Sequence, residues 1–314
     1  MNSTSPHERS RTCPICGSVS SLVYDNLKDL FMQPPGDSER FSVYLCGSCG
    51  VAHTYPQITH EDFDRYYPSD YEAYERRVGF RQLLLHVKYR RDLKIIAGEA
   101  SSGSSTMYEI GAGRAEFLKV AQEHGFEIAG TEPSDAGRQR ALGEHGIVLE
   151  NNDGENVAFS RSYDVVVLRH VLEHLSRPLS VLNTVLQKGM NPGGLLFLKV
   201  PNFQSWERER FEEYWQDLDI PRHLFHYSSS SVARLLAEVG FEHVRIRPEV
   251  IPTGIDGSLL YLSKHVPCDY PRRVYSLLPP VLRLPISQCW ATLKRRNGPG
   301  RIIITAKKPA RAAR

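Results

Sequence analysis

The sequence has no long hydrophobic run and almost no excess charge of either sign. No apolar stretch approaches the roughly 20 residues of a transmembrane helix, and the polar N-terminus lacks the apolar core of a signal peptide. The formal net charge of +3 is too small to favour a nucleic-acid partner. We therefore expect a cytoplasmic protein without a membrane span.

The length of 314 residues suits one sizeable α/β domain plus a small additional module. The first ten residues are polar, and residues 307–314 are small or basic. Such ends rarely bury enough apolar surface to become ordered. We expect residues 1–10 to form a disordered N-terminus and residues 307–314 a basic tail.

Cysteine is scarce, but four of the six cysteines form two C-x-x-C pairs, each followed by a glycine. The pairs are Cys13 with Cys16 and Cys46 with Cys49. Four thiolates can complete a tetrahedral zinc shell, and the glycine lets backbone amides point at sulfur. Residues 11–60 are therefore predicted to form a zinc-ribbon-like module with a structural zinc. A vestigial or redox site is the alternative.

A short apolar strand ends in a glycine-rich turn at Gly111-Ala-Gly113 and runs into a predicted helix. A second apolar run follows and ends at Glu132. Glycines let backbone approach a ligand closely, and an acid at the end of the second strand accepts hydrogen bonds from ribose hydroxyls. This order of elements predicts a site for a nucleoside-bearing cofactor. A glycine turn that only packs helix on strand is the alternative.

The turn departs from a dinucleotide-binding fingerprint because the third glycine is missing. Glu109 lies just before the turn, so acids flank it on both sides. Two acids would repel a diphosphate but suit a ligand with a cationic amino group and a ribose.

Further buried strands are predicted downstream. Residues 163–168 are an apolar run that delivers residues 169–175 to the carboxyl edge of a parallel sheet, where open α/β sheets bind ligands. A Pro-Gly-Gly turn introduces another strand at 191–198, and a last strand is expected at 301–306.

Together these motifs resemble the class I S-adenosylmethionine-dependent methyltransferases. The resemblance rests on the glycine turn, on His170-Val-Leu-Glu-His174, on the Pro-Gly-Gly turn and on residues 221–228. It implies an α/β, Rossmann-like core at 106–306 with a seven-stranded sheet whose last strand is antiparallel. It also implies methyl transfer from S-adenosylmethionine to a small or carrier-linked acceptor, such as a sugar, a quinone or a secondary metabolite.

The resemblance assigns the cofactor contacts. The glycine turn would meet the methionine part, the acid after the second strand would hold the ribose, and the residue after it would lie against the adenine. The residues expected to contact the cofactor are Glu109, Gly111, Ala112, Gly113, Glu132, Pro133, Asp153, Arg169 and His170.

Oxygen and carbon nucleophiles also need a proton removed, which a general base can accelerate by roughly 10²–10⁴. Histidine suits this task near neutral pH. The candidate bases are His170, His174, His223 and His226. If residues 170–174 were helical, His170, Glu173 and His174 would share one face and could bind a divalent metal. Local pairing and packing is the alternative.

Residues 61–105 connect the ribbon to the core. Four tyrosines in this stretch could fold over a cofactor as a lid or cover the seam between ribbon and core: Tyr66, Tyr67, Tyr71 and Tyr74. The first core helix is expected at 80–97, where an apolar stripe repeats with helical spacing.

Two later segments point to the acceptor. Asp217, Asp219 and Arg222 follow an aromatic stretch and would favour a hydroxylated molecule such as a sugar. The insertion at 265–296 is Pro-rich, apolar and flanked by cations. It could lie on a membrane surface or grip a lipid-linked or acyl substrate, with a helical lid or dimer contact as the alternative.

Two other classes of function stay open. One is an RNA methyltransferase whose zinc ribbon binds nucleic acid, although residues 11–60 carry no excess of arginine and lysine over acids. The other is a non-catalytic protein that has kept the cofactor-binding fold. The expected partner is a small-molecule or carrier- or lipid-linked substrate, with nucleic acid disfavoured and peripheral membrane contact open.

Overall fold

The computed structural model describes residues 9–31, 39–59, 63–66, 80–267, 270–294 and 298–310. The chain divides into two compact units, each built from separate stretches of sequence. The first contains Met1–Tyr66, Val200–Arg234 and Ile246–Ile303, and the second contains Tyr67–Lys199, Leu235–Arg245 and Ile304–Arg314.

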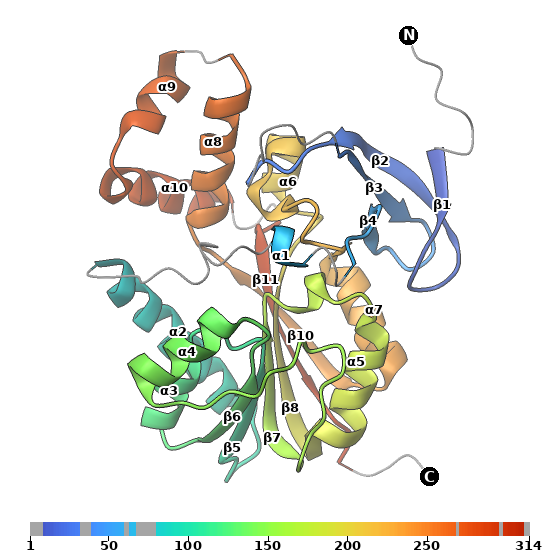
Figure 1. Ribbon diagram of the computed structural model, residues 1–314, viewed down its shortest axis with the longest axis vertical. Coiled ribbons are helices and arrows are strands. Elements are labelled where there is room, and N and C mark those ends of the chain that lie inside the picture. The colour runs from blue at the N-terminus through green and yellow to red at the C-terminus, as the bar shows by residue number, and fades with distance from the viewer. Residues whose placement is uncertain are drawn as a thin grey trace. The chain divides into compact units, whose positions relative to one another are not determined.

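The second unit is built on a six-stranded sheet in the order β10-β11-β8-β7-β5-β6. Its strands are β5 (Thr106–Ile110), β6 (Glu127–Thr131), β7 (Tyr163–Arg169), β8 (Met190–Pro201), β10 (Glu242–Glu249) and β11 (Arg301–Lys307) (Figure 1). The side chains of residues 165–168 in β7 are fully buried. This explains the unbroken apolar run of that strand, which has helices on both faces.

The pairing of the strands shows which of them run parallel and which antiparallel. β5 pairs in parallel with β6 and with β7, and β7 pairs in parallel with β8. Gly193 and Gly194 exchange backbone hydrogen bonds with Lys308, whereas Asn202 bonds to Gly300. Residue numbers therefore rise along β8 as they fall along β11, so the last strand is antiparallel, as predicted.

The expected seventh strand is reduced to a single bridge. Thr131 and Glu150 form a parallel bridge at the edge of β6, supported by hydrogen bonds between Glu132 N and Glu150 O and between Glu150 N and Gly130 O. Asn151 and Asn152 follow at once. Asparagine is depleted in strands and favours turns, which stops the pairing after one residue.

Helices cover both faces of this sheet. Helices α2 (Phe80–Glu99), α3 (Glu116–Glu123) and α4 (Asp135–His145) lie on one face, and α5 (Pro178–Thr184) lies on the other (Figure 1). A π-helical turn at Val185–Gly189 extends α5, and α7 (Ser229–Val239) precedes β10. In α3 the apolar side chains face the sheet and are buried: Phe117, Leu118, Val120 and Ala121.

The first unit contains a five-stranded antiparallel sheet in the order β1-β2-β3-β4-β9. Its strands are β1 (Ser10–Thr12), β2 (Val19–Leu27), β3 (Phe41–Cys46), β4 (Ala52–Tyr55) and β9 (Phe225–His226). The sheet of the cysteine-bearing module thus includes a strand from outside residues 11–60. Strands also reach into both segments expected to be tails, because β1 begins at Ser10 and β11 ends at Lys307.

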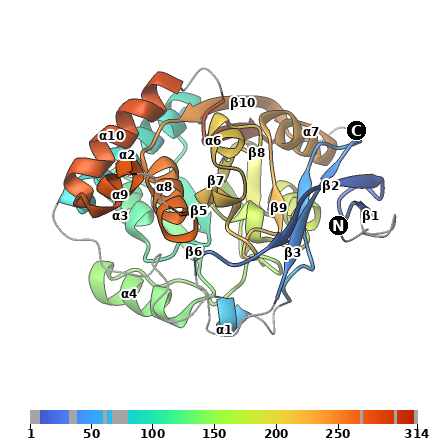
Figure 2. The ribbon, with the colours of Figure 1, turned by 90° about the horizontal axis from the view of Figure 1, so that it is seen from above.

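The α-helices that the structure describes wholly within the first unit are α1 (Phe63–Tyr66), α6 (Trp206–Phe211), α8 (Thr253–His265), α9 (Tyr270–Leu277) and α10 (Pro280–Lys294). Figure 2 shows α8, α9 and α10 side by side, and the expected insertion at 265–296 supplies the last two. Of the tyrosines proposed as a lid, Tyr66 is buried in α1. Tyr67, Tyr71 and Tyr74 lie outside the described residues.

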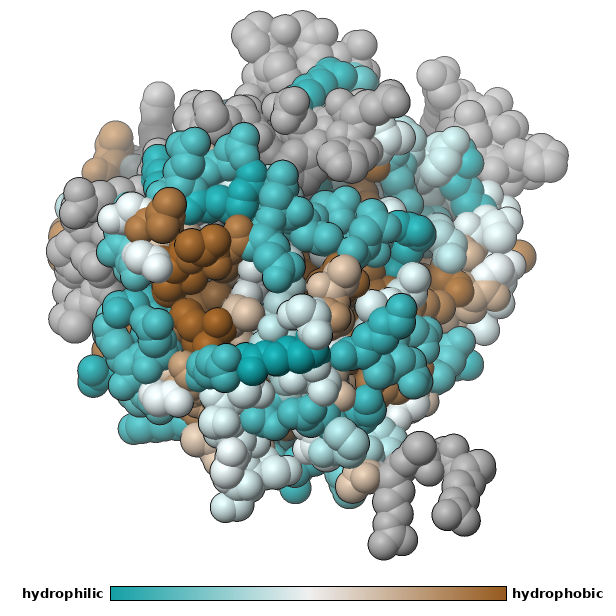
Figure 3. Space-filling view, turned by 60° about the horizontal axis from the view of Figure 1, so that its bottom comes forward, coloured by the Kyte–Doolittle hydropathy of each residue, from teal (hydrophilic) through white to brown (hydrophobic). Residues whose placement is uncertain are grey.

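In the described part of the chain, no helix combines the length and the hydropathy that crossing a bilayer requires. Hydrophilic residues cover much of the surface coloured in Figure 3, and the apolar residues on that face form separate patches.

Candidate functional site

The four cysteines of the C-x-x-C pairs come together in the first unit. The Cys13 and Cys49 sulfurs are 3.7 Å apart, the Cys16 and Cys46 sulfurs are 3.5 Å apart, and all four lie within 4.8 Å of one another. Four sulfurs placed tetrahedrally about 2.3 Å from a zinc ion would be separated by about 3.8 Å. The cluster can therefore hold zinc.

Glycine turns shape both halves of this cluster. Gly17 and Gly50 have φ of 72° and 75°, and their amides donate to the carbonyls of Cys13 and Cys46 over 2.9 and 3.1 Å. The amide of Cys49 also donates to the Cys46 sulfur over 3.5 Å. Left-handed backbone is cheap only for glycine, which is why each pair needs one. Four thiolates fill a tetrahedral shell, so the bound ion would be structural.

In the second unit, the glycine turn after β5 is closed on one side and open on the other. Gly111 and Gly113 have φ of 68° and 58°. A Cβ on Gly111 would lie 2.6 Å from a methyl of Val171, whereas one on Gly113 would meet nothing within 4 Å. Ala112 is buried, and its amide donates to Thr131 O over 2.8 Å. The turn is thus fixed to the end of β6 and leaves space beside Gly113.

Glu132 is anchored to the same turn. Its Oε2 accepts a hydrogen bond from the Gly113 amide over 2.8 Å, and its Oε1 accepts one from the Ser134 amide over 3.0 Å. Burial raises the pKa of Glu132, and the two amides act against that effect. A Cβ on Gly137 of α4 would lie 2.8 Å from Glu132, so the missing side chain lets this helix approach the carboxylate.

Two further cofactor candidates lie in loops beside these strands. The carbonyl of Pro133 accepts a hydrogen bond from Arg138 over 2.6 Å, and the carbonyl of Glu132 accepts one over 2.7 Å. Sequence reasoning did not identify this role of Arg138, which lies six residues after the acid, on helix α4. Asp153 is half-buried, and its Oδ1 accepts from the Glu155 amide over 2.9 Å in a local turn.

Arg169 was expected to contact the cofactor, and its guanidinium pairs with Glu109. Arg169 Nε donates to Glu109 Oε1 over 2.7 Å, and the guanidinium carbon lies 4.3 Å from the centre of the Phe117 ring. Burial raises the pKa of Glu109, and the charge of Arg169 acts against that effect. Among the described residues the other oxygen, Oε2, is buried without a hydrogen-bond partner. A cationic amino group could therefore still bind this carboxylate.

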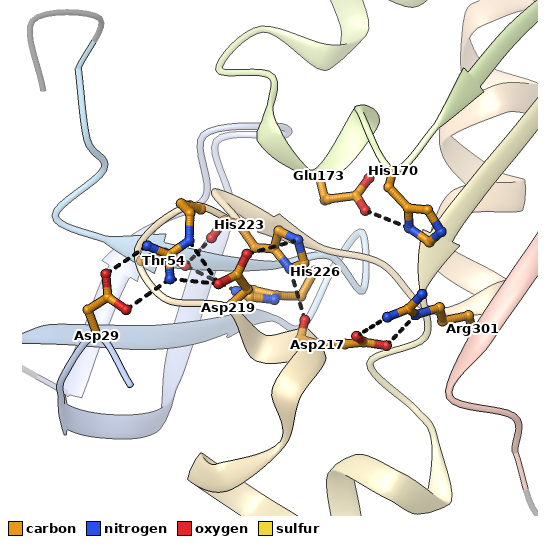
Figure 4. A network of polar contacts seen from close by, with 10 residues as sticks. Asp29, Thr54, His170, Glu173, Asp217, Asp219, His223, His226 and Arg301 are labelled. Carbon is orange, nitrogen blue, oxygen red and sulfur yellow. Dashed lines mark hydrogen bonds and ion pairs between the residues drawn. The ribbon is translucent and has the colours of Figure 1, made fainter. Parts of the chain in front are cut away.

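His170 follows β7 directly in a left-handed conformation, with φ of 59°. Its amide donates to Lys199 O over 2.9 Å, and its Nδ1 lies 3.4 Å from Glu173 Oε1 (Figure 4). The imidazole is 29% exposed. Left-handed backbone in a non-glycine residue is uncommon and occurs often at functional sites.

Residues 170–174 do not form the α-helix that the metal-binding hypothesis assumed. The left-handed residue starts the segment, and only Leu172–His174 form a short 3₁₀ helix. His174 is half-buried at its end. The i, i+3, i+4 face expected for an α-helix is therefore not formed, although His170 and Glu173 still approach each other.

The other two candidate bases belong to polar contacts of the first unit (Figure 4). His226 on β9 has its Nε2 3.0 Å from the Thr54 hydroxyl. His223 has its Nδ1 2.8 Å from the carbonyl of Asp217. Burial lowers the pKa of His226 well below its usual value, so this imidazole is neutral near pH 7 and a weak proton acceptor. A catalytic role for either histidine stays a prediction.

The acids and the arginine expected to bind a hydroxylated acceptor are paired internally. Arg301 donates to both carboxylate oxygens of Asp217 over 2.7 Å (Figure 4). Buried Arg222 makes two hydrogen bonds to Asp29, over 2.7 and 2.9 Å, and a third to Asp219. Sequence reasoning missed Asp29 and Arg301, because nothing local marks partners so far away in the chain. These groups therefore stabilise the first unit.

A family model described as a methyltransferase domain matches residues 83–246. Among curated proteins, none matches this chain.

Solved protein structures match this chain. A chain from the complex between the *Haloferax volcanii* Trm112 methyltransferase activator and the putative methyltransferase matches with a TM-score of 0.52 and 14% identity, covering 82% of this chain and 100% of that one. A SAM-dependent methyltransferase from *Archaeoglobus fulgidus* matches with a TM-score of 0.49 and 22% identity, covering 72% and 94%. At this identity the first match shows the fold alone.

Proposed function

Because this chain belongs to the methyltransferase domain family and is an S-adenosylmethionine-dependent enzyme, we propose that it methylates a hydroxyl oxygen or a carbon of a small or carrier-linked acceptor. A sugar, a quinone and a secondary metabolite are the candidate acceptors. The observation that carries the proposal is the hydrogen bond between the Gly113 amide and the Glu132 carboxylate. It fixes an acid beside an open glycine turn.

The residues at this turn fit the cofactor. The space beside Gly113 admits a ligand close to backbone, and the buried Glu132 carboxylate can accept hydrogen bonds from ribose hydroxyls. The unpartnered oxygen of Glu109 suits the cationic amino group of the methionine part. When bound, S-adenosylmethionine supplies a methyl group that its sulfonium already activates.

His170 is proposed as the general base. It follows the strand that brings the chain to the carboxyl edge of the sheet. Its ring is partly exposed, and the Nε2 atom itself is buried, so an acceptor hydroxyl would have to enter the site to reach it. The Glu173 carboxylate beside Nδ1 favours a proton on that nitrogen, which leaves Nε2 to take the proton of an acceptor hydroxyl. Glu173 would thus act as a positioning residue.

Calorimetric titration of zinc-replete protein with S-adenosylmethionine and with S-adenosylhomocysteine tests the cofactor site. We expect both to bind with micromolar affinity. A panel of sugar, quinone and secondary-metabolite acceptors, assayed for transfer of a labelled methyl group, then tests the acceptor class. Failure of both cofactors to bind would contradict the proposal, and binding without transfer to any member of the panel would contradict only the acceptor class.

A further inference from the structure

The helices α8, α9 and α10 are held together by a buried polar cluster. The carboxylate of Asp256 on α8 accepts a hydrogen bond from the Tyr275 hydroxyl on α9 over 2.7 Å, and Arg283 Nε on α10 lies 3.2 Å from the same oxygen. The Tyr275 hydroxyl also lies 2.7 Å from Ser287 Oγ on α10. Polar side chains of α9 and α10 therefore turn inward and fix how the three helices pack.

The outward side of these helices is apolar. Of the twelve large hydrophobic side chains that are exposed in the described part of the chain, six lie here and form what we call the apolar face: Val274, Leu277, Val281, Leu282, Ile286 and Leu293. Leu282, Ile286 and Leu293 share one side of α10 and are 52%, 50% and 75% exposed. A surface helix usually has the opposite arrangement, and exposed apolar patches mark interaction sites.

Positive charge gathers in the same segment. Residues 265–296 contain six arginines and lysines but only one acid, whereas the whole chain is nearly balanced, with 39 basic and 36 acidic residues. Arg272 and Arg273 belong to α9, and Arg295 and Arg296 directly follow α10 in the sequence. The apolar face is therefore part of a basic segment.

We propose that α9 and α10 dock the apolar face onto a membrane surface that carries anionic lipids. Apolar side chains would enter the boundary between headgroups and acyl chains, and the arginines and lysines of the segment other than Arg283 would bind lipid phosphates. With 15 residues, α10 is too short to span a bilayer and would lie in its surface. A second copy of this chain is a poorer occupant, because a symmetric contact would bring two basic segments together.

Co-sedimentation of the full-length, zinc-replete protein with vesicles tests this proposal. One set of vesicles contains phosphatidylcholine alone, and the other contains equal parts of phosphatidylcholine and phosphatidylglycerol. We expect sedimentation with the anionic vesicles and at least tenfold weaker binding to the neutral ones. The double variant Leu282→Asp/Ile286→Asp should lose most of the binding to anionic vesicles. The matched control Leu142→Asp/Val148→Asp, which changes two apolar residues outside the segment that are at least as exposed, should keep it.

A second variant keeps the test decisive if the first folds poorly. Arg295→Glu/Arg296→Glu leaves the apolar face intact and should weaken binding to anionic vesicles by more than tenfold. Binding equal to that of wild type by Leu282→Asp/Ile286→Asp or by Arg295→Glu/Arg296→Glu would overturn the proposal. So would a wild type that does not sediment but forms a dimer in light scattering that Leu282→Asp/Ile286→Asp converts to monomer.

Discussion

The ammonium group of Lys199 lies 2.8 Å from the carboxylate of Asp92, and each side chain is only 1% exposed. Lys199 belongs to β8 and Asp92 to α2, so the pair connects the first long helix to the middle of the sheet. The carbonyl of Lys199 also accepts a hydrogen bond from the amide of His170, next to the proposed cofactor site. This ion pair therefore supports the backbone beside the candidate base.

Asp92→Ala should destabilise the protein strongly. Removing one partner of a buried ion pair leaves an uncompensated charge, at a cost of about 3–5 kcal/mol. Denaturation in urea measures this loss. The double variant Asp92→Leu/Lys199→Met should be more stable than the single one, because neither charge remains. A single variant as stable as wild type would show that the pair contributes little.

Glu132→Ala should weaken binding of S-adenosylhomocysteine by about 10- to 100-fold, since hydrogen bonds to a charged group contribute about 1.5–3 kcal/mol. Calorimetry gives the affinity. Glu127→Ala, at the start of the strand that precedes Glu132, is the matched control, because its side chain is 63% exposed and should not contact the ligand. Equal affinities of the two variants would refute the ribose-binding role.

His170→Asn should lower turnover by about 10²-fold or more and leave cofactor affinity within about twofold, as expected when a general base is lost. Asparagine tolerates the φ of 59° better than alanine, so the change removes the imidazole with little backbone strain. Turnover and calorimetry together separate catalysis from binding. Unchanged turnover would exclude His170 as the base.

Removal of zinc should destabilise the first unit. Elemental analysis is expected to give one zinc per chain, and a strong chelator should lower the melting temperature, because metal affinity contributes directly to folding. Cys46→Ser should lose the zinc. Cys289→Ser, which changes an exposed cysteine of α10 outside the cluster, should retain it. Full zinc content in Cys46→Ser would contradict the four-thiolate site.

Glu207 should make stability depend on pH. Burial raises the pKa of this carboxyl to about 7; the neighbouring Asp217 adds to that rise, and Arg301 opposes it. The unfolded chain loses this proton at lower pH than the folded one, so rising pH from about 4.5 to 7 destabilises the fold, by on the order of 3 kcal/mol.

Glu207→Gln should therefore flatten the fall in unfolding free energy between pH 4.5 and 7. Urea denaturation at several pH values measures it, with the exposed Glu209→Gln as control. The same slope in both variants would assign the pH dependence to other groups.

Local motifs allowed much of this site to be predicted. The glycine turn at 111–113 and the C-x-x-C pairs depend on short spacings and on backbone that only glycine adopts easily, and both form as expected. Partners far apart in sequence were not predictable. Arg222 and Asp29 are 193 residues apart, and no local pattern indicates that the fold will bring them together.

The left-handed backbone of His170 was not foreseeable either. Histidine is enriched among the few non-glycine residues with positive φ, but most histidines still have negative φ, so the sequence does not single out this one. In the fold the conformation is accompanied by a hydrogen bond from the His170 amide to Lys199 O on the neighbouring strand. The helical spacing assumed from the sequence therefore wrongly placed His170, Glu173 and His174 on one face of an α-helix.

The pairing of β4 with β9 has a consequence for how the chain assembles. Thr54 and His226, which this pairing brings together, are separated by 172 residues. Residue 226 must be synthesised before the antiparallel sheet can close, so the sheet that contains the cysteine-bearing strands cannot be completed until then. Closing a sheet over so long a separation in sequence slows folding.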